Sequence, residues 1–290
     1  MSKRHGNQVR EPLLRKKATH SEVEMMKRVL VVPALALVAL TAAMPSAKAD
    51  LEQDKLDCRG TNYELVLPAC TRLIDNRKKI GQRDLIDAYY YRSNEHIRLS
   101  QYDQGLADAQ KCISLNAKDK DCINQIGRVH LGKLDYVKAL EFFQKTVKLD
   151  AKYITGWANI AYTKNQQGLY DEAIETYNRV LTLDPKYTWA YSSRGDAYSN
   201  KEDYDKALAD YQKASLIDPN YIYARTGAGY CYRKLGQFDQ ALAETDKAVA
   251  IDASYAYAFA LKGLIAFDQG QFGPAKSAFD QAINLQETTA

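Results

Sequence analysis

Five cysteines are the most reactive side chains of this 290-residue chain, and their spacing limits the chemistry that they can support. Cys58 and Cys70 bracket a short segment, while Cys112 and Cys122 flank an expected tight connection between two helices. Both arrangements suit disulfide bonds in an oxidising compartment, and the CxxC spacing of redox motifs and zinc sites is absent from the sequence. We therefore predict the pairs Cys58–Cys70 and Cys112–Cys122, with Cys231 alone. The alternative is that all five are small buried hydrophobic side chains.

Two histidines raise the possibility of a metal site. His96 and His130 occupy equivalent places in successive sequence repeats, and no other histidine follows residue 49. Tyr198 and Tyr232 hold the same place later in the chain, which is typical of a packing position, and no third ligand recurs with the pair. We therefore predict no metal. An enzyme remains an alternative only if His96 and His130 share a metal ion.

Other catalytic signatures are missing from the sequence. Asp119 and Asp121 begin like a calcium loop, but Ile123 and Asn124 stand where such a loop needs a ligand and a glycine. No glycine-rich phosphate loop occurs, and Ser-His-Asp or Cys-His schemes have only two histidines to use. We predict that the chain is not an enzyme and needs no cofactor.

The N-terminal segment has the order of a secretory signal peptide. Two basic residues precede an uncharged run over residues 29–43, and Ala47 and Ala49 provide the small residues that signal peptidase requires. We assign residues 1–49 to a leader with its signal core at 25–49. A membrane anchor is the alternative, but the run is shorter than the roughly 20 residues that span a bilayer. We expect cleavage after Ala49, only transient contact with the membrane, and a periplasmic or secreted protein in a bacterial cell envelope.

The charge balance argues against nucleic acid as a partner. The whole chain has a formal net charge of +4, with 40 Lys and Arg against 36 Asp and Glu. The leader holds the excess of cations, so residues 50–290 are slightly acidic. A protein that binds nucleic acid keeps a basic stripe in its folded part. We therefore expect a protein or an extended peptide as partner and no nucleic acid.

From Ile86 onward the sequence matches itself with a period of 34 residues, and no residue is inserted between blocks. An aromatic residue recurs at the seventeenth place and a small residue at the twentieth, which explains much of the total of 21 tyrosines. The six blocks are residues 86–119, 120–153, 154–187, 188–221, 222–255 and 256–289.

Each block has the pattern of a helical hairpin. In the third block Tyr170, Ala173 and Tyr177 follow the three- and four-residue spacing of one helix face. A turn at 167–169 separates this segment from an earlier helix, and Pro185 closes the block because proline cannot continue a helix interior. A hairpin of this size cannot bury its apolar face alone, so we expect neighbouring hairpins to stack.

These blocks resemble the tetratricopeptide repeat, and the resemblance covers residues 86–289. It implies an all-α fold, a right-handed superhelical solenoid of helical hairpins. Arg92 and Arg194 depart from the pattern because they replace a leucine. In the third block the pattern is carried by Trp157, Ile160, Ala161, Gly168, Tyr170, Ala173, Tyr177 and Pro185.

Both ends of the array are expected to differ from its middle. Residues 50–85 do not fit the repeat, and we predict a degenerate helical cap with a helix over 67–75. At the other end, Lys276 stands where the five earlier blocks have Leu or Ile. This change predicts a polar surface where no further hairpin follows.

In the family, the first helices of the hairpins line a concave groove. Relatives that clamp the C-terminal carboxylate of a chaperone have a lysine four residues before an asparagine. Here Tyr90 takes the place of that lysine before Asn94, so we do not expect that ligand. An extended peptide, held by ring stacking, amide hydrogen bonds and the charge of Arg128, is expected instead. Trp189, Tyr223 and Tyr230 are expected to face the partner rather than the core. The whole predicted lining is Tyr90, Asn94, Asn124, Arg128, Tyr162, Asn165, Trp189, Asp196, Tyr223, Tyr230, Arg233, Tyr257 and Phe267.

The sequence therefore predicts an exported scaffold or adaptor that binds protein or peptide segments in its groove. The alternative is a structural accessory subunit of a cell-envelope or polysaccharide export assembly, whose groove residues are merely solvated. The partner's identity and the oligomeric state are left open by the sequence.

Overall fold

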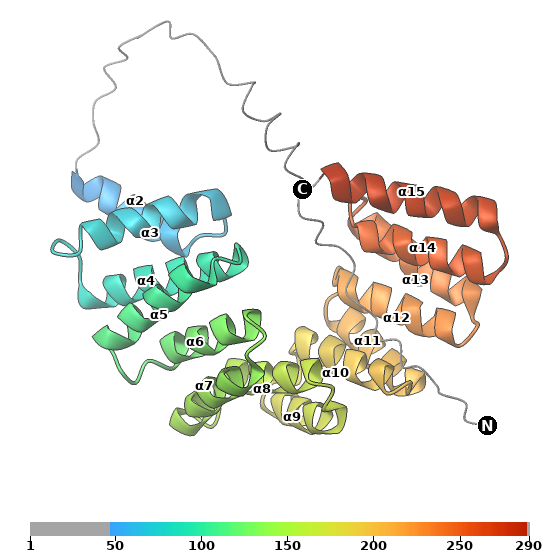
Figure 1. Cartoon of the computed structure of the whole chain (residues 1–290), viewed down its shortest axis with the longest axis horizontal. Helices are drawn as coiled ribbons and strands as arrows, with labels where there is room; N and C mark the ends of the chain where they lie inside the picture. Colours follow the sequence, from blue (N-terminus) through green and yellow to red (C-terminus); the bar gives the residue numbers. More distant parts are fainter. Residues whose placement is uncertain (1–46, 289–290) are drawn as a thin grey trace, which may run out of the picture. The chain divides into compact units, whose positions relative to one another are not determined.

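The computed structural model describes residues 47–288, and every regular element in this part is an α-helix (Figure 1). This confirms the predicted all-α fold. The predicted signal-peptide core, apart from its last three residues, lies outside the described residues. The helices are α2 (Ala47–Arg59), α3 (Tyr63–Asp75), α4 (Gln82–Arg98), α5 (Tyr102–Leu115), α6 (Lys120–Gly132), α7 (Tyr136–Leu149), α8 (Ile154–Gln166), α9 (Tyr170–Leu183), α10 (Thr188–Asn200), α11 (Tyr204–Ile217), α12 (Ile222–Lys234), α13 (Phe238–Ile251), α14 (Ala256–Asp268) and α15 (Phe272–Thr288).

Consecutive helices pair into hairpins, and each hairpin packs on the next to form a solenoid. The second helix of one hairpin contacts the first helix of the following one, as α9 does with α10. First helices of successive hairpins, such as α10 and α12, also contact one another, whereas within residues 47–288 second helices do not. The first helices therefore lie on the inner side of the array and the second helices on the outer side.

The helix boundaries follow the 34-residue period closely. Helices α6, α8, α10, α12 and α14 begin at the first residues of blocks two to six. Helix α4 begins at Gln82, four residues before the predicted first block. Residues of the expected cap form a hairpin of α2 and α3, and α3 extends the predicted helix over 67–75 back to Tyr63.

In each hairpin from α4–α5 to α14–α15, one turn residue lies in the left-handed backbone region, and in α4–α5 it is Ser100. Gly168, Gly236 and Gly270 take this place with φ between 73° and 78°. Leu134 and Glu202 take the same place with φ of 62° and 63°. The backbone conformation is thus set by the repeat, and residues other than glycine hold it at some cost.

Small residues allow the paired helices to approach closely. Ala139, Ala173, Ala207 and Ala241, at the twentieth place of their blocks, have no exposed surface. Three residues earlier, at the seventeenth place, α9 carries Tyr170 and α11 carries Tyr204. A large and a small side chain therefore lie one helical turn apart on these helices. At the far end, the side chain of Lys276 is 78% exposed and pairs with Asp280 at 2.6 Å, as expected for a polar end of the array.

Within the described residues, no helix is long and apolar enough to cross a membrane.

Candidate functional site

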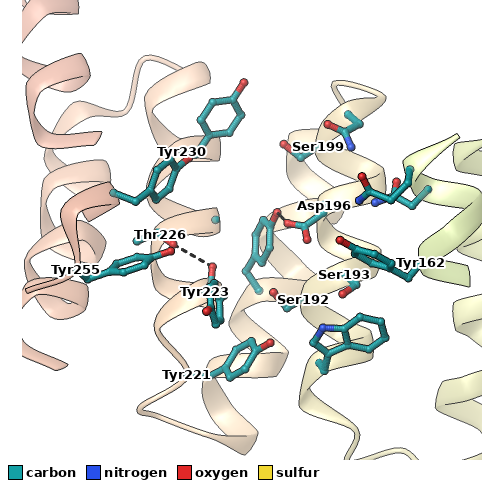
Figure 2. Close-up of a pocket in the computed structure, with 17 residues that line it drawn as sticks. Tyr162, Ser192, Ser193, Asp196, Ser199, Tyr221, Tyr223, Thr226, Tyr230 and Tyr255 are labelled. Atoms are coloured by element: carbon teal, nitrogen blue, oxygen red, sulfur yellow. Dashed lines mark hydrogen bonds between the residues drawn. The ribbon is translucent and has the colours of Figure 1, made fainter. Parts of the chain in front are cut away.

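A cavity of about 680 Å³ lies on the inner side of the array, where α8, α10, α12 and α14 follow one another. Figure 2 shows two facing walls, with Tyr221, Tyr223 and Tyr230 on one side and Asp196 and Tyr162 on the other. Hydroxyl and amide groups, including those of serines and a threonine, lie between the rings. Of the predicted groove residues, the cavity brings together Tyr162, Asn165, Trp189, Asp196, Tyr223, Tyr230 and Tyr257.

Four tyrosines form a continuous row along one wall. The ring centroids of Tyr221 and Tyr223 are 5.6 Å apart, those of Tyr223 and Tyr255 are 6.1 Å apart, and those of Tyr255 and Tyr257 are 6.2 Å apart. The rings meet at steep angles, which is a favoured arrangement for aromatic pairs. Tyr223 is 57% exposed and Tyr257 47% exposed, so this row presents apolar surface to any ligand in the cavity.

Sequence reasoning missed Tyr221 and Tyr255 as cavity residues, because it explained their recurrence by the repeat alone. They are the residues that directly precede α12 and α14. Their side chains lie at the N-terminal edge of these inner helices, where Tyr221 contacts Tyr223 and Tyr255 contacts Tyr257. The detectable signal was the recurring Tyr-x-Tyr spacing of Tyr221 with Tyr223 and of Tyr255 with Tyr257.

Trp189 is both a cavity residue and a core residue. Its ring centroid lies 5.8 Å from that of Tyr162 in the cavity, and 6.1 Å from that of Tyr177, which is fully buried. It packs against the buried cluster of α8 and α9. The expectation that Trp189 faces the partner rather than the core is therefore wrong in part, because the outer helix supplies a ring beneath it.

Tyr211 reaches the cavity from the outer helix α11. Its side chain is 2% exposed, and its hydroxyl donates a 2.6 Å hydrogen bond to Oδ1 of Asp196. A Cβ atom at Gly227 would come within 2.5 Å of the Tyr211 ring, and one at Gly195 within 2.9 Å. The two glycines on the inner helices therefore make room for the Tyr211 ring. Because the ring fits there, its hydroxyl can hold the Asp196 carboxylate.

Asp196 is the charged residue among those that line the cavity. Its side chain is open to the water of the cavity, yet tyrosines of several helices surround it. Burial within the groove raises the pKa of the Asp196 carboxyl, and the hydrogen bond from Tyr211 opposes this shift. Among residues 47–288, no Lys, Arg or His forms an ion pair with Asp196. The cavity therefore holds a carboxyl group that has no cationic partner among the described residues.

The side-chain amide of Asn165, which also lines the cavity, lacks one of its hydrogen-bond partners. The residue is 8% exposed, and its Oδ1 has no hydrogen-bond partner in the described structure. A buried amide oxygen that lacks a donor is costly, commonly by about 1–3 kcal/mol. Such an atom marks a place where a ligand can donate a hydrogen bond.

Four of the other predicted groove residues lie nearer the front of the array. Tyr90 lines a separate pocket together with Asp119 and Asp121. Arg128 donates hydrogen bonds to Asn94 at 2.5 Å and to Gln125 at 2.9 Å. Burial lowers the pKa of the Arg128 guanidinium.

Asn124 differs from its prediction as an exposed groove residue. It is 3% exposed, and its Oδ1 accepts a 2.8 Å hydrogen bond from Asn159 on the next inner helix. The amide is used to join α6 to α8, because the following hairpin covers it. Asn124 is therefore a packing residue of the inner layer.

Two predicted residues at the rear also lie outside the cavity. Arg233 forms an ion pair with Asp268 at 2.7 Å between Nε and Oδ2. Phe267 is 54% exposed and contacts the ring of Phe272 edge-on, with centroids 5.6 Å apart. These rings form a second exposed aromatic pair, away from the cavity.

The candidate metal and calcium ligands have local partners. Nδ1 of His96 lies 2.7 Å from Oε1 of Gln101, and His130 stacks on Phe142. Asp119 caps α6 by accepting hydrogen bonds from two backbone amides. In the part of the chain that the structure describes, no group of three His, Cys, Asp or Glu residues is placed to hold a metal ion.

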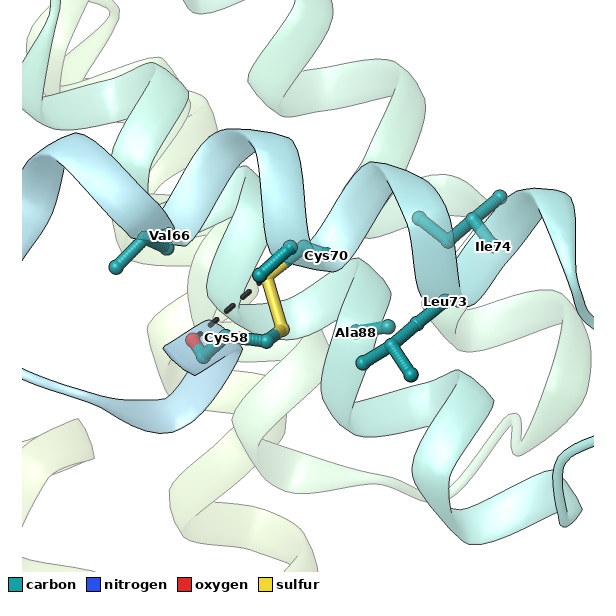
Figure 3. Packing of buried hydrophobic residues seen from close by; sticks show 7 residues of the cluster. Cys58, Val66, Cys70, Leu73, Ile74 and Ala88 are labelled. Atoms are coloured by element: carbon teal, nitrogen blue, oxygen red, sulfur yellow. Dashed lines mark hydrogen bonds between the residues drawn. A yellow bond between two sulfur atoms is a disulfide. The ribbon is translucent and has the colours of Figure 1, made fainter. Parts of the chain in front are cut away.

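The cysteines lie as the predicted pairs require. Figure 3 shows the disulfide of Cys58 and Cys70 inside the apolar cluster that joins α2, α3 and α4. Their sulfur atoms are 2.07 Å apart, and those of Cys112 and Cys122 are also at bonding distance. Cys231 is buried and free. Both pairs are compatible with an oxidising compartment.

Comparison with known proteins agrees with the stacked hairpins. A TPR repeat model matches residues 161–201, and tetratricopeptide repeat models match residues 188–221, 222–255 and 256–289. The chain is a tetratricopeptide repeat protein. A search of curated protein sequences finds no match to this repeat protein.

Solved structures show the same solenoid fold. PilF of Pseudomonas aeruginosa is 16% identical, with a TM-score of 0.59 over 69% of this chain and 90% of its own. MamA of Desulfovibrio magneticus, from residue 41 to its end, is 18% identical, with a TM-score of 0.51 over 59% of this chain and 97% of its own. At this level of identity the likeness establishes the helical-hairpin solenoid fold alone.

Proposed function

We propose that this tetratricopeptide repeat protein is an exported scaffold that holds an extended segment of another protein in the cavity of α8, α10, α12 and α14. The observation that carries the proposal is the row of Tyr221, Tyr223, Tyr255 and Tyr257, which presents ring surface beside hydroxyl and amide groups. Solenoid folds of this kind use their concave face for partners.

The composition of the wall suits a peptide better than an apolar small molecule. Tyrosine rings bury a large area while losing few rotamers, and their hydroxyls pair with the polar backbone of an extended chain. The cavity is open along the inner layer, so a segment can enter from the side and continue beyond it. Among the lining residues, side-chain amides of Asn165, Gln166 and Asn200 offer both donors and acceptors to that backbone.

Export is supported by two independent features. The N-terminal sequence has the order of a signal peptide, and two cysteine pairs lie at bonding distance in the folded part. N-terminal sequencing of the mature protein from a bacterial envelope fraction should therefore give Asp50 as the first residue. A mature chain that retains residues 29–43 would count against this part of the proposal.

Peptide binding is tested by selecting ligands from a displayed library of random twelve-residue peptides on the full chain. We expect enriched peptides that bind the parent protein and lose at least tenfold in affinity when Tyr223→Ala and Tyr257→Ala are combined, since exposed interface rings often contribute about 2 kcal/mol each. The matched control combines Phe267→Ala and Phe272→Ala, which removes an equally exposed ring pair outside the cavity.

The control variant should bind the selected peptides as the parent does, and both variants should melt close to it. Failure to enrich any peptide would favour the alternative, a structural accessory subunit without a peptide site. Peptides that bind equally to both variants would place their site elsewhere on the molecule.

A further inference from the structure

The cavity is unbalanced in its hydrogen-bonding groups and in its charge. Asp196 supplies a carboxylate with only the Tyr211 hydroxyl bound to it, and Asn165 supplies an amide oxygen without a donor. Both belong to the same wall, on the inner helices α8 and α10. No Lys or Arg belongs to the lining residues, and Arg233, also on α12, is paired with Asp268.

These groups specify the chemistry of what the cavity lacks. A ligand group that complements them must be a cation, must donate several hydrogen bonds, and must pack against aromatic faces. An acidic group is excluded, because it would meet the Asp196 carboxylate without a balancing cation. A neutral apolar side chain would leave the Asn165 oxygen without a donor and the carboxylate without a counter-charge.

We propose that the cavity binds the guanidinium of an arginine carried by the extended segment. This inference rests on the peptide-binding function proposed above and narrows its ligand. Arginine offers five donors in a planar fork, which suits a carboxylate and a neighbouring amide oxygen together. The same plane stacks on aromatic rings, and Tyr162, Tyr223, Tyr230 and Tyr257 line the same cavity as the carboxylate.

The position of Asp196 is prepared for such a partner. The Tyr211 hydroxyl holds one carboxylate oxygen, Oδ1, and the close fit of the Tyr211 ring against Gly195 and Gly227 limits its movement. Oδ2 has no partner among the described residues. A ligand therefore meets an oriented acceptor and does not need to order it on binding.

The test uses two small probes that differ in charge but hardly in shape, Nα-acetylarginine amide and Nα-acetylcitrulline amide. Each is titrated into the full mature chain, and binding is followed by NMR shifts of backbone amides in α8, α10 and α12. We expect the arginine probe to bind at least tenfold more tightly than the citrulline probe. Binding to the Asp196→Asn variant should be at least tenfold weaker than to the parent.

The Asp196→Asn variant keeps a side-chain oxygen that accepts from the Tyr211 hydroxyl, so it should retain the fold. Asp205→Asn is the matched control, because it makes the same change in net charge at an exposed place on α11 outside the cavity. The control should bind the arginine probe as the parent does. A second variant, Asn165→Leu, removes the unpartnered oxygen and should weaken binding of the arginine probe severalfold while raising the melting temperature.

Three outcomes overturn the inference: equal binding of the two probes, no binding of the arginine probe, or equal loss of affinity in Asp196→Asn and Asp205→Asn. The selected peptides then separate this failure from a wider one. If they still depend on Tyr223 and Tyr257, the peptide-binding function stands and only the arginine specificity is wrong. If no peptide is enriched either, the proposed function fails with it.

Discussion

The guanidinium of Arg194 on α10 holds the carboxylate of Asp210 on α11 through two hydrogen bonds, of 2.7 Å from Nε and 2.6 Å from Nη2. Arg92 and Asp108 make the same pair three repeats earlier, with bonds of 2.8 and 2.7 Å. Both arginines stand where the tetratricopeptide repeat has leucine. The two departures from the pattern are therefore one device, in which a buried ion pair replaces an apolar contact inside the hairpin.

Removal of one partner should be more harmful than removal of both. Arg194→Leu restores the family residue but leaves Asp210 buried without a cation, and burial already raises the pKa of that carboxyl. We expect a loss of about 3 kcal/mol in the free energy of unfolding, measured by urea denaturation. The double variant with Asp210→Leu should recover most of this loss. Equal stability of the single and double variants would contradict the role of the pair.

The repeat period was enough to predict where most inner helices begin, because consecutive blocks have no insertion and each boundary carries the same turn residues. It could not show which inner-face residues stay accessible. Asn124 satisfies the same helical offset as its exposed counterparts, yet Asn159 of the next hairpin covers it. Burial of this kind depends on contacts between repeats, which a single-repeat pattern does not contain.

The same limit applies to the cavity. Tyr211 belongs to an outer helix, and the helical offset therefore assigns it to the core. Its hydroxyl reaches Asp196 only because Gly195 and Gly227 leave the inner helices bare at that level. The ring that fills the space beside each of these glycines is identified by the structure alone.

Replacement of Leu134 by glycine should stabilise the fold. The φ of Leu134, 62°, lies in the left-handed region, and its side chain is 69% exposed, so replacement removes strain and little packing. We expect Leu134→Gly to raise the free energy of unfolding by about 0.5–1 kcal/mol. Leu235→Gly is the control, because Leu235 has a φ of −82° and should lose stability when it becomes glycine. Thermal melts of both variants check the prediction, which fails if both are destabilised alike.

The disulfide of Cys58 and Cys70 should stabilise the front of the array. Closing a loop of about a dozen residues contributes on the order of 3 kcal/mol in the chain-entropy model. The double replacement by serine should lower the melting temperature and speed hydrogen exchange in α2 and α3, with α14 unaffected. Cys231→Ser serves as the control that should leave exchange in α2 and α3 unchanged. A peptide map of oxidised protein with free thiols at both positions would rule the bond out.

Lys276 should keep the rear end of the solenoid from associating. Its equivalents Ile174 and Leu208 are 9% and 7% exposed because the following hairpin covers them, whereas Lys276 is open to solvent. Lys276→Leu should therefore increase the mass measured by light scattering as concentration rises. Lys145→Leu is the matched control, since Lys145 also pairs with a carboxylate four residues away, on the outer helix α7. An unchanged mass for Lys276→Leu at high concentration would refute the capping role.

Asp196 should make stability depend on pH in a definite direction. Because burial raises its pKa in the folded protein above that of the unfolded chain, the folded state holds the proton more tightly. The contribution of Asp196 to the free energy of unfolding is therefore fully present below an ordinary aspartate pKa of about 4. It is lost as the pH rises through the raised pKa of Asp196 in the folded protein.

The Asp196→Asn variant should then melt above the parent at pH 7, and the difference should disappear as the pH is lowered towards an aspartate pKa of about 4. The other titratable groups near this carboxylate are Cys231 and tyrosines, whose pKa values burial moves upward, so they do not titrate in this range. Asp205→Asn, which lies outside the cavity, should not melt above the parent at pH 7. Calorimetric melts across this range decide the matter, and a difference between Asp196→Asn and parent that stays constant with pH would mean that the groove does not perturb this carboxyl.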